Sequence, residues 1–210
     1  MKRRHFIAAA ALGVAVGTST AQTNGPARIL VVGDSLSAEY GIARGTGWVA
    51  LLEKRLADEK FMATVHNASI SGDTTPGGRA RLPALLGSVK PNVVVIELGG
   101  NDALRGLPLQ GTEDNLRSMA RAAQKAGAKV LLVGMQVPPN YGRDYAQRFS
   151  GVFGTVAKTE KTGLVPFLLK GVADAPDPLK LFQPDRIHPK AEAHPVLLNN
   201  VWPELRKLLK

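Results

Sequence analysis

The chain has 210 residues, no cysteine and a formal net charge of +10. This length gives room for one or two domains, and it allows a sizeable core to be buried without disulfide bonds. The absence of cysteine excludes a disulfide framework, a cysteine-based zinc site, a cysteine nucleophile and a lipoprotein anchor. Hydrophobic residues are 44% of the chain and charged residues 21%, which is typical of a globular protein.

The N-terminus has the composition of a secretory signal peptide over residues 1–21. Residues 2–4 are basic, residues 6–16 form an unbroken apolar run, and small residues follow up to Ala21. The run is shorter than the roughly 20 residues that a membrane span needs. We therefore expect cleavage after Ala21, a mature domain over residues 22–210, and export to the periplasm or beyond. The paired arginines also fit a twin-arginine signal, and an uncleaved amphipathic anchor is the alternative.

The positive charge of the mature chain does not indicate a nucleic-acid partner. The leader carries three positive residues and no acidic one, so the net charge of +10 becomes +7 after cleavage. The remaining lysines and arginines are scattered, and only 5% of the residues are aromatic, which argues against base stacking. We expect no nucleic acid among the partners and no stable insertion into a membrane.

Short apolar runs alternate with helical patterns along the mature chain. Runs rich in valine and isoleucine predict strands that are buried on both faces. In chain order, the sequence predicts a strand over 28–32, a helix around 48–56, a weaker strand over 62–67, a helix around 82–86, a strand over 93–98, a helix over 112–127, a strand over 129–133, a weaker strand over 164–168, and a helix from Pro189 to the C-terminus. Thr112 is the candidate cap of its helix, and proline is favoured at a first helical position.

This alternation predicts one α/β domain with three layers, α/β/α. Its sheet is expected to be doubly wound, mostly parallel and five-stranded, as in flavodoxin-like folds. Ligands of such sheets bind outside the carboxyl ends of the strands. The loops that follow the strands are therefore the places where we look for chemistry.

A candidate nucleophile and its base lie far apart in the sequence. Ser35 comes two residues after the first strand, in a Gly-Asp-Ser-Leu turn, and a serine hydroxyl needs an adjacent base to act as a nucleophile. Asp185 precedes His188 by three residues, so its carboxylate can meet the imidazole across one turn and fix the tautomer. The alternatives are a serine that caps a helix and a capping aspartate beside a surface histidine.

Two further loops offer hydrogen-bond donors. Asn101 follows the strand over 93–98 in a Gly-Gly-Asn-Asp turn, and Gly72 lies in the loop after the strand over 62–67. An amide side chain and a backbone N–H that aim at one point are what an oxyanion hole requires. The alternative is ordinary turn chemistry, in which asparagine and glycine are common. Asp34 and Asp102 are expected to organise their loops.

The four blocks together resemble the SGNH (GDSL) hydrolase family, in the family's order and over nearly the whole mature chain. They lie at residues 33–36, 72, 99–102 and 185–188. The segments NASISGDT, ELGGNDALRGL and DRIHPKAEAHP are similar to the secreted bacterial branch of acyl-CoA thioesterase I, protease I or lysophospholipase L1 and its arylesterase relatives. This resemblance implies a three-layer fold and broad esterase and thioesterase activity, with no metal and no cofactor.

Carried over by position, the resemblance makes Ser35 the nucleophile and adds Asp185 and His188 as the rest of a triad. The backbone N–H groups of Ser35 and Gly72 and the side chain of Asn101 become the oxyanion hole. One departure is Arg186, where glycine is common in the branch, and it is expected to affect access to His188. The remaining histidines are poorer bases: one leaves with the signal, and the others lie in a strand and in the last helix (His5, His66 and His194).

Two loops are expected to bind the acyl chain. Residues 103–110 and 136–141 follow the strands over 93–98 and 129–133, and both mix apolar side chains with proline or glycine. In the resembled branch the first of them is a switch loop over the acyl chain. The candidate substrate-binding residues are Leu104, Leu107, Leu109, Val137 and Pro138. The alternative for the leucines is that they only pack their loop onto the domain.

The function expected from these residues is that of a secreted, monomeric serine ester hydrolase. Its substrates are small acyl esters, thioesters or lysophospholipids. Since CoA thioesters are not expected outside the cytoplasm, lysophospholipids, fatty-acid esters and aryl esters are favoured as physiological substrates. The alternatives are a deacetylase of carbohydrates or other small acyl groups with the same fold, and a binding module that has lost activity.

Overall fold

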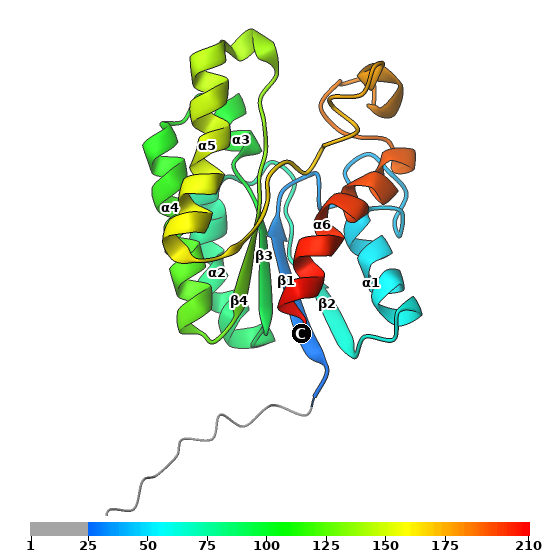
Figure 1. Cartoon of the computed structure of the whole chain (residues 1–210), viewed down its shortest axis with the longest axis vertical. Helices are drawn as coiled ribbons and strands as arrows, with labels where there is room; N and C mark the ends of the chain where they lie inside the picture. The colour runs from blue at the N-terminus through cyan, green and yellow to red at the C-terminus, as the bar shows by residue number, and fades with distance from the viewer. Residues whose placement is uncertain (1–24) are drawn as a thin grey trace, which may run out of the picture.

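Five parallel strands form a single sheet at the centre of the molecule (Figure 1). The computed structural model describes residues 25–210, so the predicted signal peptide lies outside the described residues. The strand order is β2-β1-β3-β4-β5, and the predicted five-stranded α/β sheet is confirmed. The strands are β1 (Ala27–Gly33), β2 (Ala63–Asn67), β3 (Val93–Glu97), β4 (Lys129–Val133) and β5 (Gly163–Val165).

Helices cover both faces of the sheet and complete the three layers (Figure 1). One face is covered by α1 (Trp48–Asp58) and α6 (His194–Leu208). The other face is covered by α2 (Thr75–Val89), α4 (Leu109–Lys125) and α5 (Arg143–Glu160). Short elements complete the chain: α3 (Gly100–Leu104) and the 3-10 turns η1 (Pro139–Tyr141), η2 (Pro178–Leu181) and η3 (Ala191–Ala193).

The hydrophobic core lies on both sides of the two central strands. All residues of β3 are buried, and so is β1 from Ile29 onward, which is why these strands have uninterrupted apolar runs instead of alternation. Large side chains fill the spaces under the helices, with Trp48 from α1 and Phe149 and Phe153 from α5 fully buried. This packing gives a rigid platform under the loops at the carboxyl end of the sheet.

Two predicted helix starts are wrong. α4 begins at Leu109, and Thr112 does not cap it, because the buried Thr112 hydroxyl donates to the Asp102 carboxylate at 3.2 Å. α6 begins at His194, because Pro189 is held in an isolated bridge to Phe182 and a 3-10 turn follows it. In both cases a contact with a distant residue overrides the local preference.

The sheet also differs from the prediction at its edge. β5 ends at Val165, before Pro166, whose missing N–H cannot continue the ladder. The long helix α5 packs against β4 and β5, and its sequence pattern had not been identified as helical.

The chain reverses its direction along the sheet between β1 and β3. The first crossover leads from β1 outward to β2, and α2 then returns the chain to β3 on the other side of β1. Gly33, the last residue of β1, is in register with Glu97, the last residue of β3. A ligand site is expected outside the carboxyl ends of such a pair of strands.

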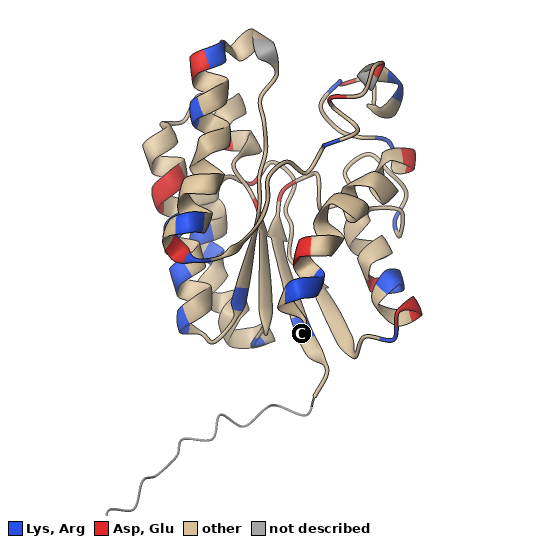
Figure 2. Cartoon of the chain, in the orientation of Figure 1, with Lys and Arg blue, Asp and Glu red and all other residues tan. Residues whose placement is uncertain are grey.

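Several lysine and arginine positions lie at the opposite end of the molecule, where the strands begin (Figure 2). Lys129 opens β4, and Lys125, Arg206 and Lys207 lie in the last turns of α4 and α6. Cations are favoured there because the carboxyl end of a helix carries partial negative charge. The basic residues at these two helix ends therefore have a structural explanation that does not involve a ligand.

Candidate active site

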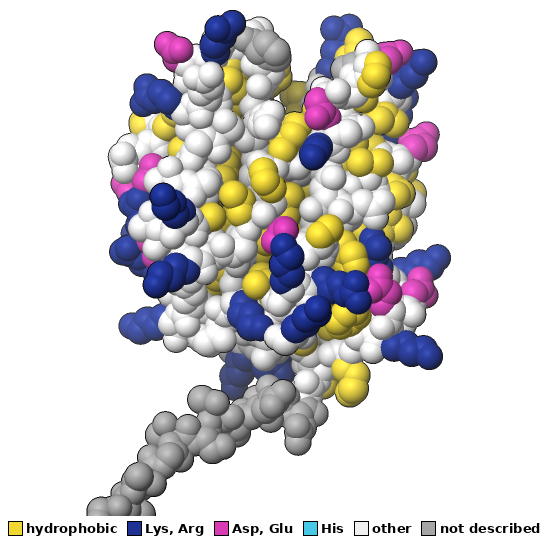
Figure 3. Space-filling view, in the orientation of Figure 1, with side chains coloured by type: hydrophobic (Ala, Val, Ile, Leu, Met, Phe, Trp, Pro, Cys, Tyr) yellow, Lys and Arg dark blue, Asp and Glu magenta, His cyan; other side chains and the backbone are white. Residues whose placement is uncertain are grey.

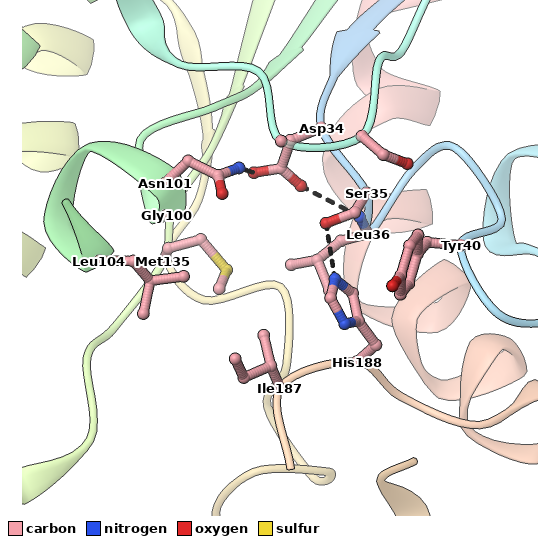
Figure 4. Close-up of a pocket in the computed structure, with 12 residues that line it drawn as sticks. Asp34, Ser35, Leu36, Tyr40, Gly100, Asn101, Leu104, Met135, Ile187 and His188 are labelled. Atoms are coloured by element: carbon pink, nitrogen blue, oxygen red, sulfur yellow. Dashed lines mark hydrogen bonds between the residues drawn. The ribbon is translucent and has the colours of Figure 1, made fainter. Parts of the chain in front are cut away.

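Ser35, His188 and Asp185 form one chain of hydrogen bonds at the carboxyl end of the sheet. The His188 Nε2 atom lies 2.8 Å from the Ser35 Oγ atom (Figure 4), and His188 Nδ1 lies 2.7 Å from Asp185 Oδ2. Ser35 follows β1, whereas the other two residues lie between η2 and η3, and 153 positions separate Ser35 from His188. A hydroxyl in this position can transfer its proton to the imidazole and attack an electrophile.

Asp185 is held as an anion by its own turn. Its Oδ1 atom accepts the backbone N–H groups of Ile187 at 2.9 Å and His188 at 3.0 Å. Desolvation raises the pKa of the Asp185 carboxyl, but the hydrogen bonds from the His188 and Ile187 backbone and from the imidazole outweigh it and lower the pKa to about 2. A carboxylate at this place can accept the Nδ1–H of the imidazole and orient the ring.

Arg186, between the two, adopts the left-handed backbone region with φ of 60°. Glycine enters that region without steric cost, which gives a physical reason for its frequent use at such a turn. The exposed Arg186 side chain lines a separate pocket beside Gln183 and Lys190, and it does not line the cleft that contains Ser35.

Two backbone N–H groups are available beside the Ser35 hydroxyl. Ser35 and Gly72 both line the cleft, and within residues 25–210 neither of their N–H groups has a hydrogen-bond acceptor. Gly72 has φ of 78°, so a side chain at this position would be strained. Free donors of this kind are suited to an oxyanion.

The Asn101 side chain lies near the same point, but its amide is already engaged. Its Nδ2 atom donates to Asp34 Oδ2 at 3.0 Å (Figure 4) and to the Asp73 carbonyl oxygen at 2.9 Å. Both amide hydrogens therefore have acceptors in this structure. An oxyanion must share or replace one of these two bonds to be bound by Asn101.

A pair of buried acids lies beneath the Ser35 turn. Burial raises the pKa of Asp34 to about 6, although hydrogen bonds from the Leu36 N–H and Asn101 partly offset it. Burial, and then the Asp34 charge, raises the pKa of Glu97 well above its ordinary range. Glu97 is therefore the neutral member of the pair. Its Oε2 atom accepts the Ser37 hydroxyl at 2.8 Å and the Asp34 N–H at 3.3 Å.

This network holds the backbone on both sides of Ser35. The Ser37 hydroxyl also accepts the indole N–H of Trp48 at 3.2 Å, which connects the turn to α1. The sequence analysis missed Glu97. A single glutamate at the end of an otherwise apolar strand was the signal that could have identified it.

An open cleft of about 410 Å³ lies beside Ser35. At the carboxyl end of the sheet the molecule has two projections, one with η1 and the start of α5 and the other with η2, and the space-filling view shows hydrophobic side chains between them (Figure 3). The apolar part of the cleft wall consists of Leu36, Tyr40, Leu104, Met135 and Ile187.

The predicted acyl-binding loops contribute less to this wall than expected. Leu104 lines the cleft and is 47% exposed. Leu109 and Val137 pack against the core instead, Leu107 is half-buried, Pro138 is exposed, and none of these four lines the cleft. The early start of α4 explains the position of Leu109, because the chain turns into the helix layer there.

The wall residues that the sequence analysis missed are Leu36, Tyr40, Met135 and Ile187. Leu36 and Ile187 are direct neighbours of Ser35 and His188 in the sequence, which was a usable signal.

The other histidines do not contact Ser35. His66 is exposed on β2, and His5 lies outside the described residues. His194 is buried, its Nδ1 atom accepts the Trp48 N–H at 3.0 Å, and burial lowers its pKa. This histidine joins the beginnings of α6 and α1.

Comparisons with known proteins identify the family of the chain. Residues 31–196 match the GDSL-like Lipase/Acylhydrolase family. The chain is 58% identical over 181 residues to Esterase TesA of Pseudomonas aeruginosa, covering 86% of this chain and 89% of that protein. It is 40% identical over 181 residues to Thioesterase 1/protease 1/lysophospholipase L1 of Escherichia coli K12, covering 86% and 84%. The crystal structure of TesA superposes with a TM-score of 0.83 at 57% identity, over 86% of this chain and 99% of that one.

The chain therefore belongs to the GDSL-like lipase/acylhydrolase family, and it is an ester hydrolase. The family predicted from the four sequence blocks is confirmed.

Proposed function

We propose that this ester hydrolase works through a covalent acyl-enzyme, with Ser35 as the nucleophile, His188 as the general base and acid, and Asp185 as the orienting carboxylate. The observation that carries the proposal is the continuous hydrogen-bonded chain from Asp185 through His188 to Ser35, which opens into a cleft. No metal or cofactor takes part in the proposed reaction.

The steps follow from the donors and acceptors. The Ser35 Oγ atom attacks the acyl carbon while its proton moves to His188 Nε2. The bond to the leaving oxygen or sulfur then breaks, and His188 returns the proton to the leaving group. Water attacks the acyl-enzyme by the same proton route in reverse, which releases the acid and restores Ser35.

The negative charge on the acyl oxygen is proposed to be held by the N–H groups of Ser35 and Gly72 and by the Asn101 amide. The two backbone donors are free in the described part of the chain, whereas the amide must give up or share its bond to Asp73 or Asp34. Asn101 would then strengthen its contact only as the oxyanion forms, which is where binding accelerates the reaction.

The substrate proposed is an acyl ester or thioester with an apolar chain, and lysophospholipids and aryl esters belong to this class. The support is the apolar cleft wall of Leu36, Leu104, Met135 and Ile187 and the names of the relatives. A screen of p-nitrophenyl esters from acetyl to palmitoyl tests this proposal. Activity restricted to acetyl groups would favour the deacetylase alternative.

Export is proposed from the leader sequence. Residues 1–21 have the basic start, apolar run and small-residue end of a signal peptide, and no helix within residues 25–210 is long and apolar enough to cross a membrane. N-terminal sequencing of protein from a periplasmic fraction tests it, and the expected first residue is Gln22. An intact Met1 in that fraction would contradict cleavage.

The role of Ser35 is tested with a fluorophosphonate probe. The wild-type protein should gain the mass of one adduct and lose activity, because the activated hydroxyl attacks phosphorus as it attacks an acyl carbon. Ser35→Ala should gain none, and Ser71→Ala, which removes another hydroxyl at the cleft, is the matched control and should be labelled like the wild type. Labelling that persists in Ser35→Ala contradicts the assignment.

A further inference from the structure

Tyr40 places its aromatic ring against the His188 ring (Figure 4). The ring centroids are 4.4 Å apart and the planes are tilted by 40°. Tyr40 is nevertheless 50% exposed, so its position is not explained by burial in the core. A large aromatic side chain that is kept half in water beside a reactive histidine requires another explanation.

The backbone around Tyr40 is unusual and firmly held. The preceding residue, Glu39, has φ of 59°, a region that costs free energy for residues other than glycine. The Glu39 carboxylate stabilises this turn by accepting the N–H groups of Gly45 at 2.9 Å and Gly47 at 2.8 Å. Gly41, on the other side, has φ of 70°. Such a conformation persists only where its surroundings determine it.

Gln183 connects the Tyr40 turn to the His188 loop. Its Nε2 atom donates to the Tyr40 carbonyl oxygen at 2.9 Å and to the Pro189 carbonyl oxygen at 3.1 Å. Its backbone N–H donates to the His188 carbonyl oxygen at 2.8 Å. One side chain therefore fixes the backbones that carry both rings, and the relative position of the rings follows from this link.

The other sides of the imidazole are already occupied. Nδ1 faces the Asp185 carboxylate and Nε2 faces the Ser35 hydroxyl. The Asp34 carboxylate also interacts with His188 through its charge. The His188 side chain is only 15% exposed, so water has little access to a charge on this ring. The centroid of the Tyr40 ring is 4.4 Å from that of the imidazole, within the distance of about 6 Å at which the face of an aromatic ring attracts a cation.

We propose that Tyr40 is a positioning residue that stabilises the imidazolium form of His188 through the face of its ring. The inference rests on the proposed triad. The proton travels from the Ser35 hydroxyl to His188 Nε2 and on to the leaving group, and Tyr40 exchanges no proton. Its effect is to lower the free energy of the state in which His188 carries the positive charge.

The test uses Tyr40→Leu, which removes the quadrupole but keeps an apolar side chain, and Tyr40→Phe, which keeps the ring. Activity is measured as kcat/KM against pH, with p-nitrophenyl acetate and with an alkyl acetate. Tyr40→Leu should lower kcat/KM by about twofold to thirtyfold for both substrates, since this is the range of cation–π effects. It should also move the acidic limb of the profile to lower pH, while Tyr40→Phe keeps both properties.

Other roles of the ring give different results. If Tyr40 only binds an aromatic leaving group, Tyr40→Leu raises KM for the aryl ester alone, and the inference is wrong. If Tyr40 only excludes water, its removal lets water solvate the imidazolium, so the acidic limb moves to higher pH. Met62→Leu is the control, because Met62 is exposed on the far edge of the sheet before β2.

A graded series of substitutions at position 40 keeps the proposal testable if Tyr40→Leu folds poorly. Phenylalanines with increasing ring fluorination at position 40 keep the shape of the ring and weaken its quadrupole. A stepwise decrease of kcat/KM with fluorination supports the inference, and a constant kcat/KM overturns it. If the wild-type protein itself neither reacts with the fluorophosphonate probe nor cleaves the esters, the proposed triad has failed, which is a distinct outcome.

Discussion

Glu97→Gln should change the pH dependence of stability, because Glu97 is buried as a neutral acid. Its side chain is fully buried, its Oε1 atom has no hydrogen-bond partner within the described residues, and its Oε2 atom accepts the Ser37 hydroxyl. Glutamine has nearly the same shape, and its carbonyl oxygen can accept the same bonds. The substitution removes the titration and leaves most of the packing intact.

The magnitude follows from proton linkage. Burial raises the pKa of Glu97 well above its ordinary range, so the folded protein keeps a proton that the unfolded chain loses above about pH 4.3. The free energy of unfolding of the wild type must then decrease by about 1.4 kcal/mol for each pH unit until the folded group itself ionises. Glu97→Gln lacks this slope. Its stability relative to the wild type should therefore rise by about 1.4 kcal/mol for each pH unit above roughly pH 5, until Glu97 of the folded wild type ionises.

Urea denaturation at several pH values measures this difference. In thermal unfolding each pH unit corresponds to a relative change in Tm of about 3–6 °C for a domain of this size. Asp34, with its pKa raised to about 6, titrates in both proteins, and its charge raises the pKa of Glu97 in the wild type alone. Glu53→Gln, on the exposed face of α1, is the control and should show no such trend. A difference between Glu97→Gln and the wild type that stays constant with pH would refute the reasoning.

Three further predictions concern catalysis. Ser35→Ala and His188→Ala should each lower kcat by at least about 10³-fold, and the double variant should be hardly slower, because members of a triad act as a unit. If the two losses multiply in the double variant, the two residues do not act in the same step. Asn101→Ala should lower kcat by about 10²–10³ with little change in KM, and a change confined to KM would remove Asn101 from the oxyanion hole. Leu104→Asn should flatten the rise of kcat/KM with acyl-chain length, since each buried methylene contributes about 0.8 kcal/mol, which is about fourfold in kcat/KM. An equal loss of kcat/KM at every chain length would exclude Leu104 from the wall that binds the acyl chain.

The blocks that contain the proposed catalytic residues could be recognised from the sequence because each one is local. The Gly-Asp-Ser turn after a strand and the three-residue spacing of Asp185 and His188 are short-range patterns, and backbone geometry within one turn produces them. The central strands could be predicted from the sequence for a related reason. A strand buried on both faces must be apolar at every position, so β1 and β3 stand out without knowledge of their neighbours.

The cleft wall and the helix starts depend on residues that are distant in the sequence. Leu107 and Leu109 have the same hydrophobicity as Leu104, but α4 begins at Leu109 and carries the chain away from the cleft. Thr112 looks like a cap and instead binds Asp102, and Pro189 looks like a helix start and instead pairs with Phe182. Residues differ in helix propensity by less free energy than such long-range contacts contribute. The contacts therefore decide where the helices begin.

The sequence by itself determined the fold class, the family and the order of the four motif blocks along the chain, because apolar periodicity and short motifs are local properties. The tertiary structure alone decided which side chains meet. It brings Ser35 to His188 across 153 positions, places the neutral Glu97 beneath them, and holds Tyr40 against the imidazole. The physical reason is that the doubly wound sheet places the carboxyl ends of β1 and β3 at one edge. The distances between side chains and their burial are set only when the chain has folded.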